Sequence, residues 1–489
     1  MAVSLGRIAD SLGATVAPHD RTIVVEDVTH DSRAVRPGWL FVAVRGATHD
    51  GHDHLDAAVA AGAVAVLVEE PVRPGVPRIV VPDTRAAMAP AARQVHGAPD
   101  VDLSIVGVTG TNGKTTVVHM CEAVWRSIGR PHGLVGTLGA RFEGTPVPLA
   151  RTTPESTDLQ RLLGTMRDSG VESVAMEVSS HALELHRADA IRFLAVGFTN
   201  LSQDHLDFHA TMERYLDAKR KLFEIHRASQ AVVNTDDPAG RSIAATTPLP
   251  VVSVGFDEGV DWRATGVSLS PTGTRFELRG PGGSAVVDLP LAGRFNVENA
   301  LVASGLLACD GVSIAEIAEG LAAIDPIPGR MEVVGHGGPF TVIVDYAHTP
   351  DAIAEVLAAS RAMASGRIIS VVGAGGDRDA AKRTSMGAAA ASESDVTIVT
   401  TDNPRSEDPV EIARRVQEGA LAAGRADVRM VLERDEAISV AIAEANPSDV
   451  VLILGKGHEQ GQEIGGVMYP FDDREAARRA LAAAGWGEA

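Results

Sequence analysis

The sequence predicts an α/β protein of three domains built on parallel sheets. Short runs rich in β-branched residues alternate with alanine-rich helical stretches along the chain. At 489 residues the chain is longer than one ordinary domain, and two turn-rich segments, "HGAPDVD" and "IDPIPGR", divide it. We therefore expect domains at residues 1–100, 101–328 and 329–489, with doubly wound parallel sheets in the two larger ones.

Composition narrows the class of protein before any motif is considered. Apolar residues make up 45% of the chain, and the formal net charge of -20 argues against nucleic acid as the main partner. The two cysteines, Cys121 and Cys309, fit no metal spacing and suit a reducing compartment. The N-terminus lacks the pattern of a signal peptide, and the longest apolar run is too short to span a bilayer. We expect a cytoplasmic protein without a membrane span.

The second block opens with "SIVGVTGTNGKTTVV", the pattern of a strand, a glycine loop and a helix. Gly110 and Gly113 let the backbone N–H groups turn inward, and the helix N-terminus adds partial positive charge. Lys114 adds a cation, and Thr115 adds a hydroxyl suited to Mg²⁺. Val108 stands where the common pattern has glycine, so the loop is a variant of the phosphate-binding type. The alternative is a glycine-rich turn that binds no phosphate, which the strand–helix context disfavours.

Two later strands of this block also end in polar residues. "SVAMEVSSH" leads to Glu177, and "FLAVGFTNLSQDHLDFH" leads to His205. Because ligands gather beyond the carboxyl ends of parallel strands, we expect both side chains near the phosphate loop. His205 and His209 have the spacing of a zinc pair, but the glutamate of that motif is absent. Lys219, in the helical stretch that follows, has the local pattern of a solvated helix lysine.

The third block repeats the arrangement with four apolar runs that stop at polar loops. We expect these loops to converge at one edge of a parallel sheet, although each residue alone is more simply a surface-loop residue. The candidate binding residues are Arg378, Asp402, Asn403, Arg405, Gly455 and Glu459.

Taken in order, these motifs resemble the Mur ligase family, the ATP-dependent amide-forming enzymes of peptidoglycan precursor synthesis. The resemblance rests on "GVTGTNGKTT", "MEVSSHAL", "FTNLSQDHLDFHATMERYLDAKRKLF", "GRFNVENA", "PGRMEVV", "VDYAHTPDA", "GAGGDRDAAKR", "TDNPRSEDP" and "LGKGHE". The first block is similar too, through "DSR" and "PGWLFVAVRG". The resemblance implies a smaller uridine-nucleotide-binding α/β domain, a central P-loop ATPase-like domain and a C-terminal Rossmann-like domain.

The activity implied by the resemblance is addition of the third residue to UDP-N-acetylmuramoyl-L-alanyl-D-glutamate. ATP would phosphorylate the D-glutamyl side-chain carboxylate, and the amine of meso-diaminopimelate would attack the acyl phosphate, releasing phosphate beside ADP. The implied cofactors are ATP, two Mg²⁺ ions and CO₂ held as a carbamate of Lys219. A carbamate supplies the oxygen ligands that Mg²⁺ prefers, whereas a bare ammonium has no oxygen to offer. The expected partners are small molecules, and the expected state is a monomer.

The resemblance also assigns residues to roles. For ATP it implies Gly110, Thr111, Asn112, Gly113, Lys114, Thr115, Thr116, Asn296, Arg330 and Asp345. For the UDP-linked substrate it implies Ser32, Thr152, Thr153, Ser179 and Arg187, and the apolar Leu185 departs from some relatives there. For the metals it implies Thr115, Glu177, His205 and carbamylated Lys219, the last three being catalytic together with Lys114.

Arg405, in "TDNPRSEDP", bears on which amino acid is added. As a surface-turn residue it would pair with Glu407 or Asp408. As a binding residue it would hold the distal carboxylate of diaminopimelate, which L-lysine lacks. Glu459 would then take the distal ammonium, and Arg378 the carboxylate near the reacting amine.

Several alternatives stay open on the residues. L-Lysine or LL-diaminopimelate could replace the meso isomer, and Arg405 does not separate the two diaminopimelates, since both carry the distal carboxylate. A folate-polyglutamate ligase is disfavoured by the first block and by "DNPR". A P-loop regulatory NTPase is disfavoured by polar loops ending strands in all three blocks.

Overall fold

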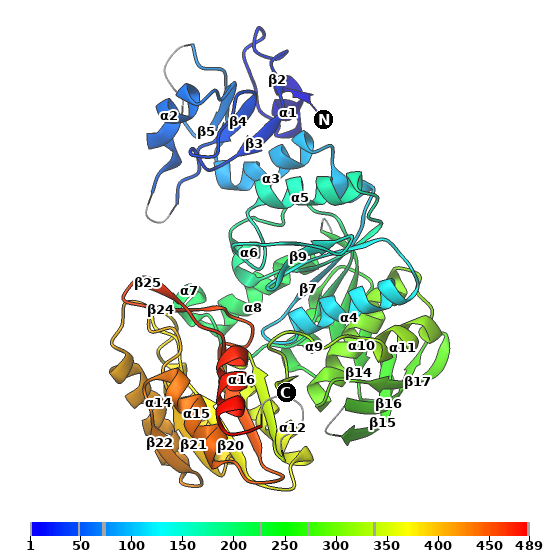
Figure 1. The fold of residues 1–489 in the computed structure, drawn as a ribbon. Helices are drawn as coiled ribbons and strands as arrows, with labels where there is room; N and C mark the ends of the chain where they lie inside the picture. Colours follow the sequence, from blue (N-terminus) through cyan, green and yellow to red (C-terminus); the bar gives the residue numbers. More distant parts are fainter. Residues whose placement is uncertain are drawn as a thin grey trace.

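The computed structural model describes residues 2–46, 49–70, 75–224, 227–270, 273–335 and 339–486. These residues form three α/β domains that follow one another along the chain, each with its own hydrophobic clusters (Figure 1). No helix among the described residues is long and apolar enough to cross a membrane.

The N-terminal domain is built on a parallel sheet of four short strands in the order β3-β4-β5-β6. The strands are β3 (Asp27–Thr29), β4 (Trp39–Val42), β5 (Ala65–Val68) and β6 (Arg78–Val80), beside an antiparallel pair, β1 (Val3–Ser4) and β2 (Val24–Val25). The helical segments are α1 (Leu5–Ser11), η1 (Gly51–His54), α2 (Leu55–Ala60), α3 (Thr84–Val95) and η2 (Pro99–Val101).

The central domain contains a sheet of eleven strands among the described residues, in the order β10-β9-β8-β11-β7-β12-β13-β14-β15-β16-β17. Its strands are β7 (Ser104–Thr109), β8 (His132–Gly136), β9 (Gly139–Phe142), β10 (Thr145–Val147), β11 (Ser173–Glu177), β12 (Phe193–Phe198), β13 (Ala228–Asn234), β14 (Val251–Gly255), β15 (Trp262–Ser270), β16 (Gly273–Gly280) and β17 (Gly283–Leu289). Its helical segments are α4 (Lys114–Ser127), α5 (Ser156–Asp168), α6 (Ser180–Glu184), α7 (Leu206–His209), α8 (Met212–Arg220), η3 (Lys221–Phe223), α9 (Pro238–Thr246), α10 (Arg294–Cys309) and α11 (Ile314–Ala322).

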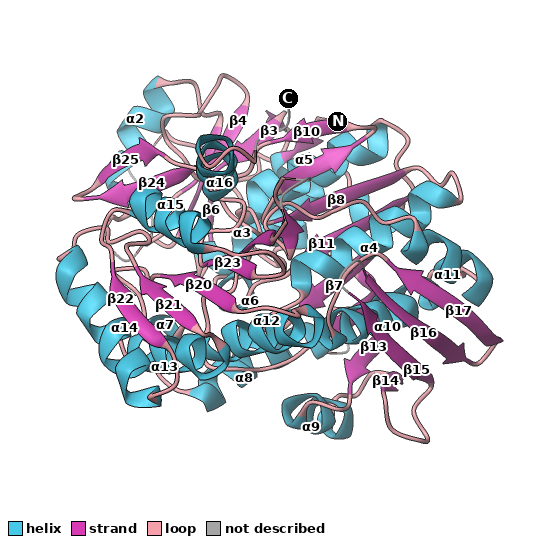
Figure 2. Cartoon of the chain, turned by 60° about the horizontal axis from the view of Figure 1, so that its bottom comes forward, coloured by secondary structure: helices cyan, strands magenta, loops and turns pink. Residues whose placement is uncertain are grey.

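The middle of this sheet is parallel, as the sequence predicts, but both of its ends are antiparallel. β16 joins β17 through Pro281 and Gly282 alone, and so short a connection can join only antiparallel strands. The central strands are buried on both faces because helices cover both sides of the sheet (Figure 2). Burial of each large apolar side chain contributes about 1.5–3 kcal/mol, so the strands that end at the candidate site lie in a well-stabilised core.

The C-terminal domain has a sheet in the order β18-β19-β23-β20-β21-β22, parallel except for β18. The strands are β18 (Glu332–Val333), β19 (Thr341–Asp345), β20 (Ile368–Val372), β21 (Val396–Val399), β22 (Asp427–Met430) and β23 (Val450–Leu454). The helices are α12 (Pro350–Met363), α13 (Lys382–Glu393), α14 (Pro409–Ala423), α15 (Arg434–Glu444) and α16 (Asp473–Ala483). A separate hairpin is formed by β24 (Gly461–Ile464) and β25 (Val467–Pro470).

The N-terminal domain meets the central one where α3 lies along α5 (Figure 1). Polar contacts cross this junction: Arg161 Nε donates to Asp27 Oδ2 over 2.9 Å. Arg85 pairs with the buried Glu155 at 3.4 Å. The first domain is thus attached next to the segment that carries Thr152 and Thr153.

Candidate active site

The glycine loop between β7 and α4 has the geometry of a phosphate cradle. Gly110 and Gly113 have positive φ angles of 151° and 85°. A Cβ atom at Gly110 would lie 1.9 Å from Thr199 Oγ1, and one at Gly113 would lie 2.1 Å from Asn299 Oδ1. Both positions therefore require glycine. Lys114 curls back over the loop, where its Nζ donates to the carbonyls of Gly110 (2.9 Å) and Thr111 (2.8 Å).

Thr115, Glu177 and Arg330 meet at the start of α4. Thr115 Oγ1 donates to Glu177 Oε1 over 3.0 Å, and Arg330 Nη2 donates to Thr115 Oγ1 over 3.1 Å. Glu177 is buried at the end of β11 and also accepts from the N–H of Thr137 over 2.8 Å. β11 lies next to β7 and runs parallel to it, so the two strands end at the same edge of the sheet. Glu177 therefore lies near the phosphate loop, as expected from the sequence.

Lys219 lies in α8 and is almost completely buried, at 1% exposure. Its Nζ donates to the carbonyl of Gly110 over 2.7 Å and lies 4.3 Å from the ring centre of Tyr215. Burial, and then the charge of Lys114, hold the pKa of Lys219 well below its usual value. This environment favours the uncharged amine, in contrast to the solvated lysine that its local pattern suggests.

Asp204 links the central domain to the C-terminal one. Its Oδ1 accepts a 2.8 Å hydrogen bond from Lys382 Nζ, and its Oδ2 lies 3.4 Å from Nε2 of both His205 and His348. Asp204 and Lys382 are both buried. His205 adopts a left-handed backbone with φ of 55°, and burial lowers its pKa to about 3. Sequence reasoning missed the roles of Asp204 and Lys382, because the contact joins residues from two domains.

His209, whose spacing from His205 suggested a zinc pair, is engaged elsewhere. Its Nε2 lies 2.9 Å from Ser180 Oγ, and burial lowers its pKa to about 4.

A pocket between the central and C-terminal domains continues from the glycine loop. Asn296 Nδ2 donates to the carbonyl of Ala292 over 2.8 Å, which holds the side chain in the pocket wall. Asp345 accepts 2.7 Å hydrogen bonds from the N–H groups of Met331 and Ala347, and burial raises its pKa. The pocket also includes Asn112, Gly113, Thr116, Arg330, Tyr346 and Glu355. Asn296, Arg330 and Asp345, assigned by resemblance, thus line one pocket with the glycine loop.

The residues predicted for the UDP-linked substrate fall into two places. Thr153 Oγ1 donates to the carbonyl of Glu177 over 2.9 Å and accepts from the N–H of Ser179 over 3.1 Å. Thr152 Oγ1 lies 3.1 Å from Thr137 Oγ1, while the buried Arg187 lies 3.0 Å from Glu155. Ser32 lies instead in the loop after β3, in the N-terminal domain. A ligand that touched all of these residues would span two domains.

Four of the six C-terminal candidates lie together at the end of the sheet. Asn403 Nδ2 donates to Glu459 Oε2 over 2.8 Å, and the buried Lys456 donates to the same carboxylate oxygen over 2.8 Å. A Cβ atom at Gly455 would lie 2.6 Å from Asp402 Oδ2, so these two loops also touch. Lys456 was missed, although it belongs to the quoted motif "LGKGHE".

Arg405 does not make the local ion pairs that a surface turn would give it. Glu407 pairs with Arg383 at 2.7 Å, and Asp408 caps α14 by accepting from the N–H of Val410 over 2.9 Å. The Arg405 guanidinium instead donates through Nη1 to the carbonyl of Gly376 over 2.6 Å. Its Nε lies 3.5 Å from Glu463 Oε2. Pairs this exposed contribute at most about 1 kcal/mol.

Arg378, the sixth candidate, is exposed and donates to the carbonyl of Asp377 over 3.2 Å. Its predicted contact with a substrate stays a prediction. The next residue, Asp379, accepts from Gln203 Nε2 over 3.1 Å, so this loop does contact the central domain.

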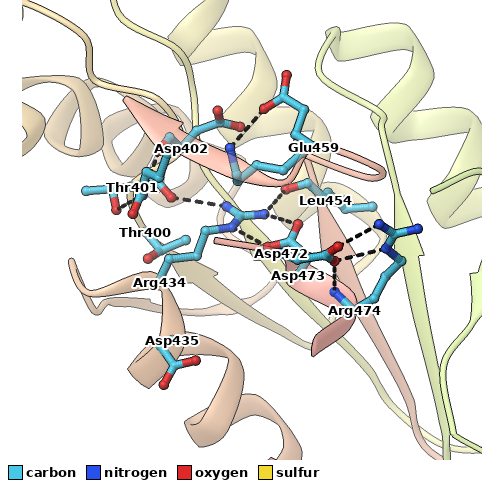
Figure 3. A network of polar contacts seen from close by, with 12 residues as sticks. Thr400, Thr401, Asp402, Arg434, Asp435, Leu454, Glu459, Asp472, Asp473 and Arg474 are labelled. Carbon is cyan, nitrogen blue, oxygen red and sulfur yellow. Dashed lines mark hydrogen bonds and ion pairs between the residues drawn. The ribbon is translucent and has the colours of Figure 1, made fainter. Parts of the chain in front are cut away.

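A buried arginine supports the two loops that carry Asp402 and Gly455. Arg434 forms a double hydrogen bond with Asp473 at 2.7 Å for each contact, and both side chains have no exposed surface. The same guanidinium donates to the carbonyls of Thr401 (3.1 Å) and Leu454 (2.9 Å), immediately before each loop (Figure 3). Arg434 therefore fixes the ends of both loops to α16.

Comparison with known proteins agrees with the three-domain α/β fold. Three family models match: the Mur ligase family catalytic domain at residues 24–96, the Mur ligase middle domain at 108–307 and the Mur ligase glutamate ligase domain at 329–457. The UDP-N-acetylmuramoyl-L-alanyl-D-glutamate–2,6-diaminopimelate ligase of Streptomyces coelicolor is 45% identical over 98% of this chain and 96% of its own. The protein of the same name from Geobacillus thermodenitrificans is 46% identical over 92% of this chain and 94% of its own.

A solved structure bearing that ligase name superposes with a TM-score of 0.71 at 32% identity, covering 99% of both chains. The three family models together span most of the chain, in the order of the three domains. This chain therefore belongs to the Mur ligase family, whose members are ATP-dependent amide-forming enzymes.

Proposed function

We propose that this chain joins meso-diaminopimelate to the D-glutamyl side-chain carboxylate of UDP-N-acetylmuramoyl-L-alanyl-D-glutamate, at the expense of ATP. The observation that carries the proposal is the position of Asp204. It bonds Lys382 of the C-terminal domain and lies 3.4 Å from His205, in the segment whose Ser202 exchanges hydrogen bonds with Thr111 of the phosphate loop. This contact between domains supports our assignment of the nucleotide site and the candidate amino-acid loops to one active site.

The residues of the chain explain how a carboxylate and an amine can condense there. The bond between the β–γ bridging oxygen and the γ-phosphorus of ATP breaks as the D-glutamyl carboxylate takes the phosphoryl group. The amine then forms the amide C–N bond and loses a proton. The C–O bond to the phosphoryl group breaks, so phosphate leaves with one oxygen of the former carboxylate. Lys114 lies over the loop that holds the phosphates and offsets their charge. The contacts between the central and C-terminal domains would align the reactants and help to exclude water.

The donor atoms fit the Mg²⁺ ions that the family resemblance implies. No group of three or more His, Cys, Asp or Glu side chains among the described residues would hold a metal by itself. Mg²⁺ is commonly bound by one or two carboxylates together with substrate phosphates and water. Thr115 and Glu177, with oxygens 3.0 Å apart, offer such a partial set, and His205 would serve a second ion. When bound, Mg²⁺ neutralises phosphate charge during transfer.

Lys219 fits the role of a carbamylated lysine. Carbamylation needs an uncharged amine, and burial keeps the pKa of Lys219 low. The carbamate would be an anion beside Lys114, whereas the partners of the bare lysine in the described parts of the chain are a carbonyl and an aromatic ring. The modification would thus balance charge within the site and supply an oxygen ligand.

We assign the remaining substrates by domain. Residues 1–100 would bind the uridine end through Ser32, residues 101–328 ATP and the muramoyl peptide, and residues 329–489 the amino acid. Arg405 would read the distal carboxylate of diaminopimelate, because its guanidinium keeps donor capacity beyond the Gly376 carbonyl. We further propose that the protein acts in the cytoplasm as a monomer and without a nucleic-acid partner.

The proposal is tested by measuring ATP-dependent ligation with the UDP-linked dipeptide and competing amino acids. We expect turnover with meso-diaminopimelate to exceed that with L-lysine by more than a hundredfold, the size of a lost bidentate charge pair. Preference for L-lysine would contradict the assignment. Fast phosphate release without the dipeptide would instead favour a regulatory NTPase.

The carbamate is tested separately with Lys219→Ala. We expect this variant to fold and to bind ATP but to lose nearly all ligation, and formate or acetate to restore part of it by replacing the oxygen ligand. A direct readout is the incorporation of ¹³C-labelled CO₂ as a carbamate signal in wild type that Lys219→Ala lacks. Full activity of the variant without added carboxylate would exclude this role.

A further inference from the structure

The β24–β25 hairpin places a carboxylate, that of Glu463, beside the candidate amino-acid loops. The carbonyl of Glu463 accepts from the N–H of Arg405 over 2.9 Å, and its own N–H donates to Asn403 Oδ1 over 3.0 Å. Two residues further, the N–H of Gly465 donates to the carbonyl of Arg405 over 2.7 Å. These backbone contacts fix the position of Glu463 relative to Arg405 and Asn403.

The side chains of Glu463 and Arg405 face each other without forming a tight pair. Their 3.5 Å separation exceeds the 2.7–2.9 Å usual for a charge-assisted hydrogen bond. The side chains are 34% and 22% exposed, so solvent reaches both. Nη1 of Arg405 bonds the Gly376 carbonyl, but Nη2 has no protein acceptor within the described parts of the chain. A ligand can therefore approach a cation and an anion that lie side by side.

Glu459, which we expected from the sequence to take the distal ammonium, is less available than Glu463. Its Oε2 accepts from both Lys456 Nζ and Asn403 Nδ2 at 2.8 Å, and Lys456 has no exposed surface. The charge of Glu459 is thus balanced by a buried lysine of the protein. Among the described residues, the ion-pair partner of Glu463 is Arg405 alone.

We propose that Glu463 is a specificity-determining residue that reads, with Arg405, the distal end of the amino acid as a matched pair of charges. This inference rests on the proposed function. The distal carbon of diaminopimelate carries a carboxylate, which Arg405 takes, and an ammonium, which Glu463 takes. A substrate with only the distal carboxylate is repelled by Glu463, and one with only the distal ammonium is repelled by Arg405. The pair thus selects a zwitterionic end over either charge alone.

The test compares two amino acids on wild type and Glu463→Gln. meso-Diaminopimelate carries both distal charges, whereas L-2-aminopimelate keeps the reacting amine and the distal carboxylate but lacks the distal ammonium. For Glu463→Gln we expect kcat/KM to fall about threefold with diaminopimelate and to rise about threefold with aminopimelate. The selectivity ratio should therefore shrink about tenfold, while the KM for ATP and the Tm stay unchanged.

Two further variants sharpen the result. Glu411→Gln removes an equal charge from an exposed pair with Arg414 on α14 and should leave the ratio unchanged. Glu463→Asp keeps the charge and should retain most of the selectivity. The inference is overturned if Glu463→Gln changes kcat/KM for both amino acids by the same factor. That result is expected if Glu463 only blocks Arg405 or only supports the hairpin. Failure of wild type to use diaminopimelate would overturn the proposed function itself, so the two failures are distinct.

Discussion

Two arginines of the C-terminal domain meet carboxylates in opposite ways. Arg434 and Asp473 are completely buried and joined by two 2.7 Å hydrogen bonds, with two backbone carbonyls taking further donors (Figure 3). Arg405 and Glu463 are partly exposed and 3.5 Å apart. Both arginines contact or adjoin the same loop after β21. A guanidinium that makes four hydrogen bonds within the protein holds the fold, whereas one whose side chain makes a single such bond among the described residues can bind a ligand.

The contrast is also one of energy. In a buried ion pair the attraction between the charges roughly offsets the cost of removing them from water, so the net contribution to stability is small. Removal of one partner is nevertheless strongly destabilising, because the other charge stays buried without compensation. A partly exposed pair loses little when it is broken. The comparison therefore predicts that substitution of Arg434 changes stability and that substitution of Arg405 changes substrate binding.

The largest expected effect is on the buried pair. Arg434→Met should lower the free energy of unfolding by about 3–5 kcal/mol, because Asp473 would stay buried without a partner. The measurement is thermal and denaturant unfolding. The double variant Arg434→Met/Asp473→Leu should regain more than half of the loss. A loss below about 1 kcal/mol in the single variant would break the comparison.

Arg405→Ala should give the converse result. We expect the KM for diaminopimelate to rise by about thirty- to several-thousand-fold, equivalent to about 2–5 kcal/mol. Stability should change by at most about 1 kcal/mol, and the KM for ATP should hardly move. The preference over L-lysine should shrink, since a repulsive cation is gone. The measurement is steady-state kinetics with diaminopimelate and with L-lysine. An unchanged preference for diaminopimelate would refute the role of Arg405 in reading the distal carboxylate.

Lys382 tests an intermediate case, a buried pair that joins two domains. Lys382→Met should lower kcat/KM by about ten- to 150-fold, because the closed arrangement loses a charged hydrogen bond of about 1.5–3 kcal/mol. Small-angle scattering should show a larger radius for the variant. Lys382→Arg, which keeps the charge, should lose less. Kinetics and radius equal to wild type would show that the contact does not support closure.

The smallest effect concerns Glu298, a half-buried carboxyl that forms no ion pair with the described residues. Burial, followed by the charge of Asp236, raises the pKa of Glu298 from 4.5 to about 7. The folded state then binds more protons than the unfolded state between these values, so stability falls as pH rises from about 4.5 to 7. Glu298→Gln should flatten this fall by a few °C in Tm, about the size expected for 1 kcal/mol in a large domain. An identical pH profile would contradict the raised pKa.

The sequence was sufficient to predict the three α/β domains, the family and the phosphate loop. It also predicted Glu177 near the phosphate loop, because the carboxyl ends of parallel strands meet at a common edge, and Glu177 does contact Thr115 there. The antiparallel ends of the central sheet were not predicted, since alternation of strands and helices says little about short connections at an edge. The assignments of individual residues to ligands stay predictions.

The supporting residues were beyond reach for a physical reason. Nothing in the sequence indicates the partners of Arg434, Lys456 and Lys382, although the two lysines lie in quoted motifs, and only burial against distant groups reveals them. For Arg405, sequence proximity suggested Glu407 or Asp408, which pair elsewhere. Its ion pair is set by tertiary packing.

The bond between Asp204 and Lys382 has a consequence for the timing of turnover. If the products leave by separation of the two domains, that separation must part a buried carboxylate from a buried ammonium. Departure of the products would then depend on the strength of a contact within the protein, and not only on their own affinities. Weakening this contact should speed release but let water reach the acyl phosphate. The strength of this one contact would therefore influence both the rate of turnover and the amount of ATP lost through hydrolysis of the acyl phosphate.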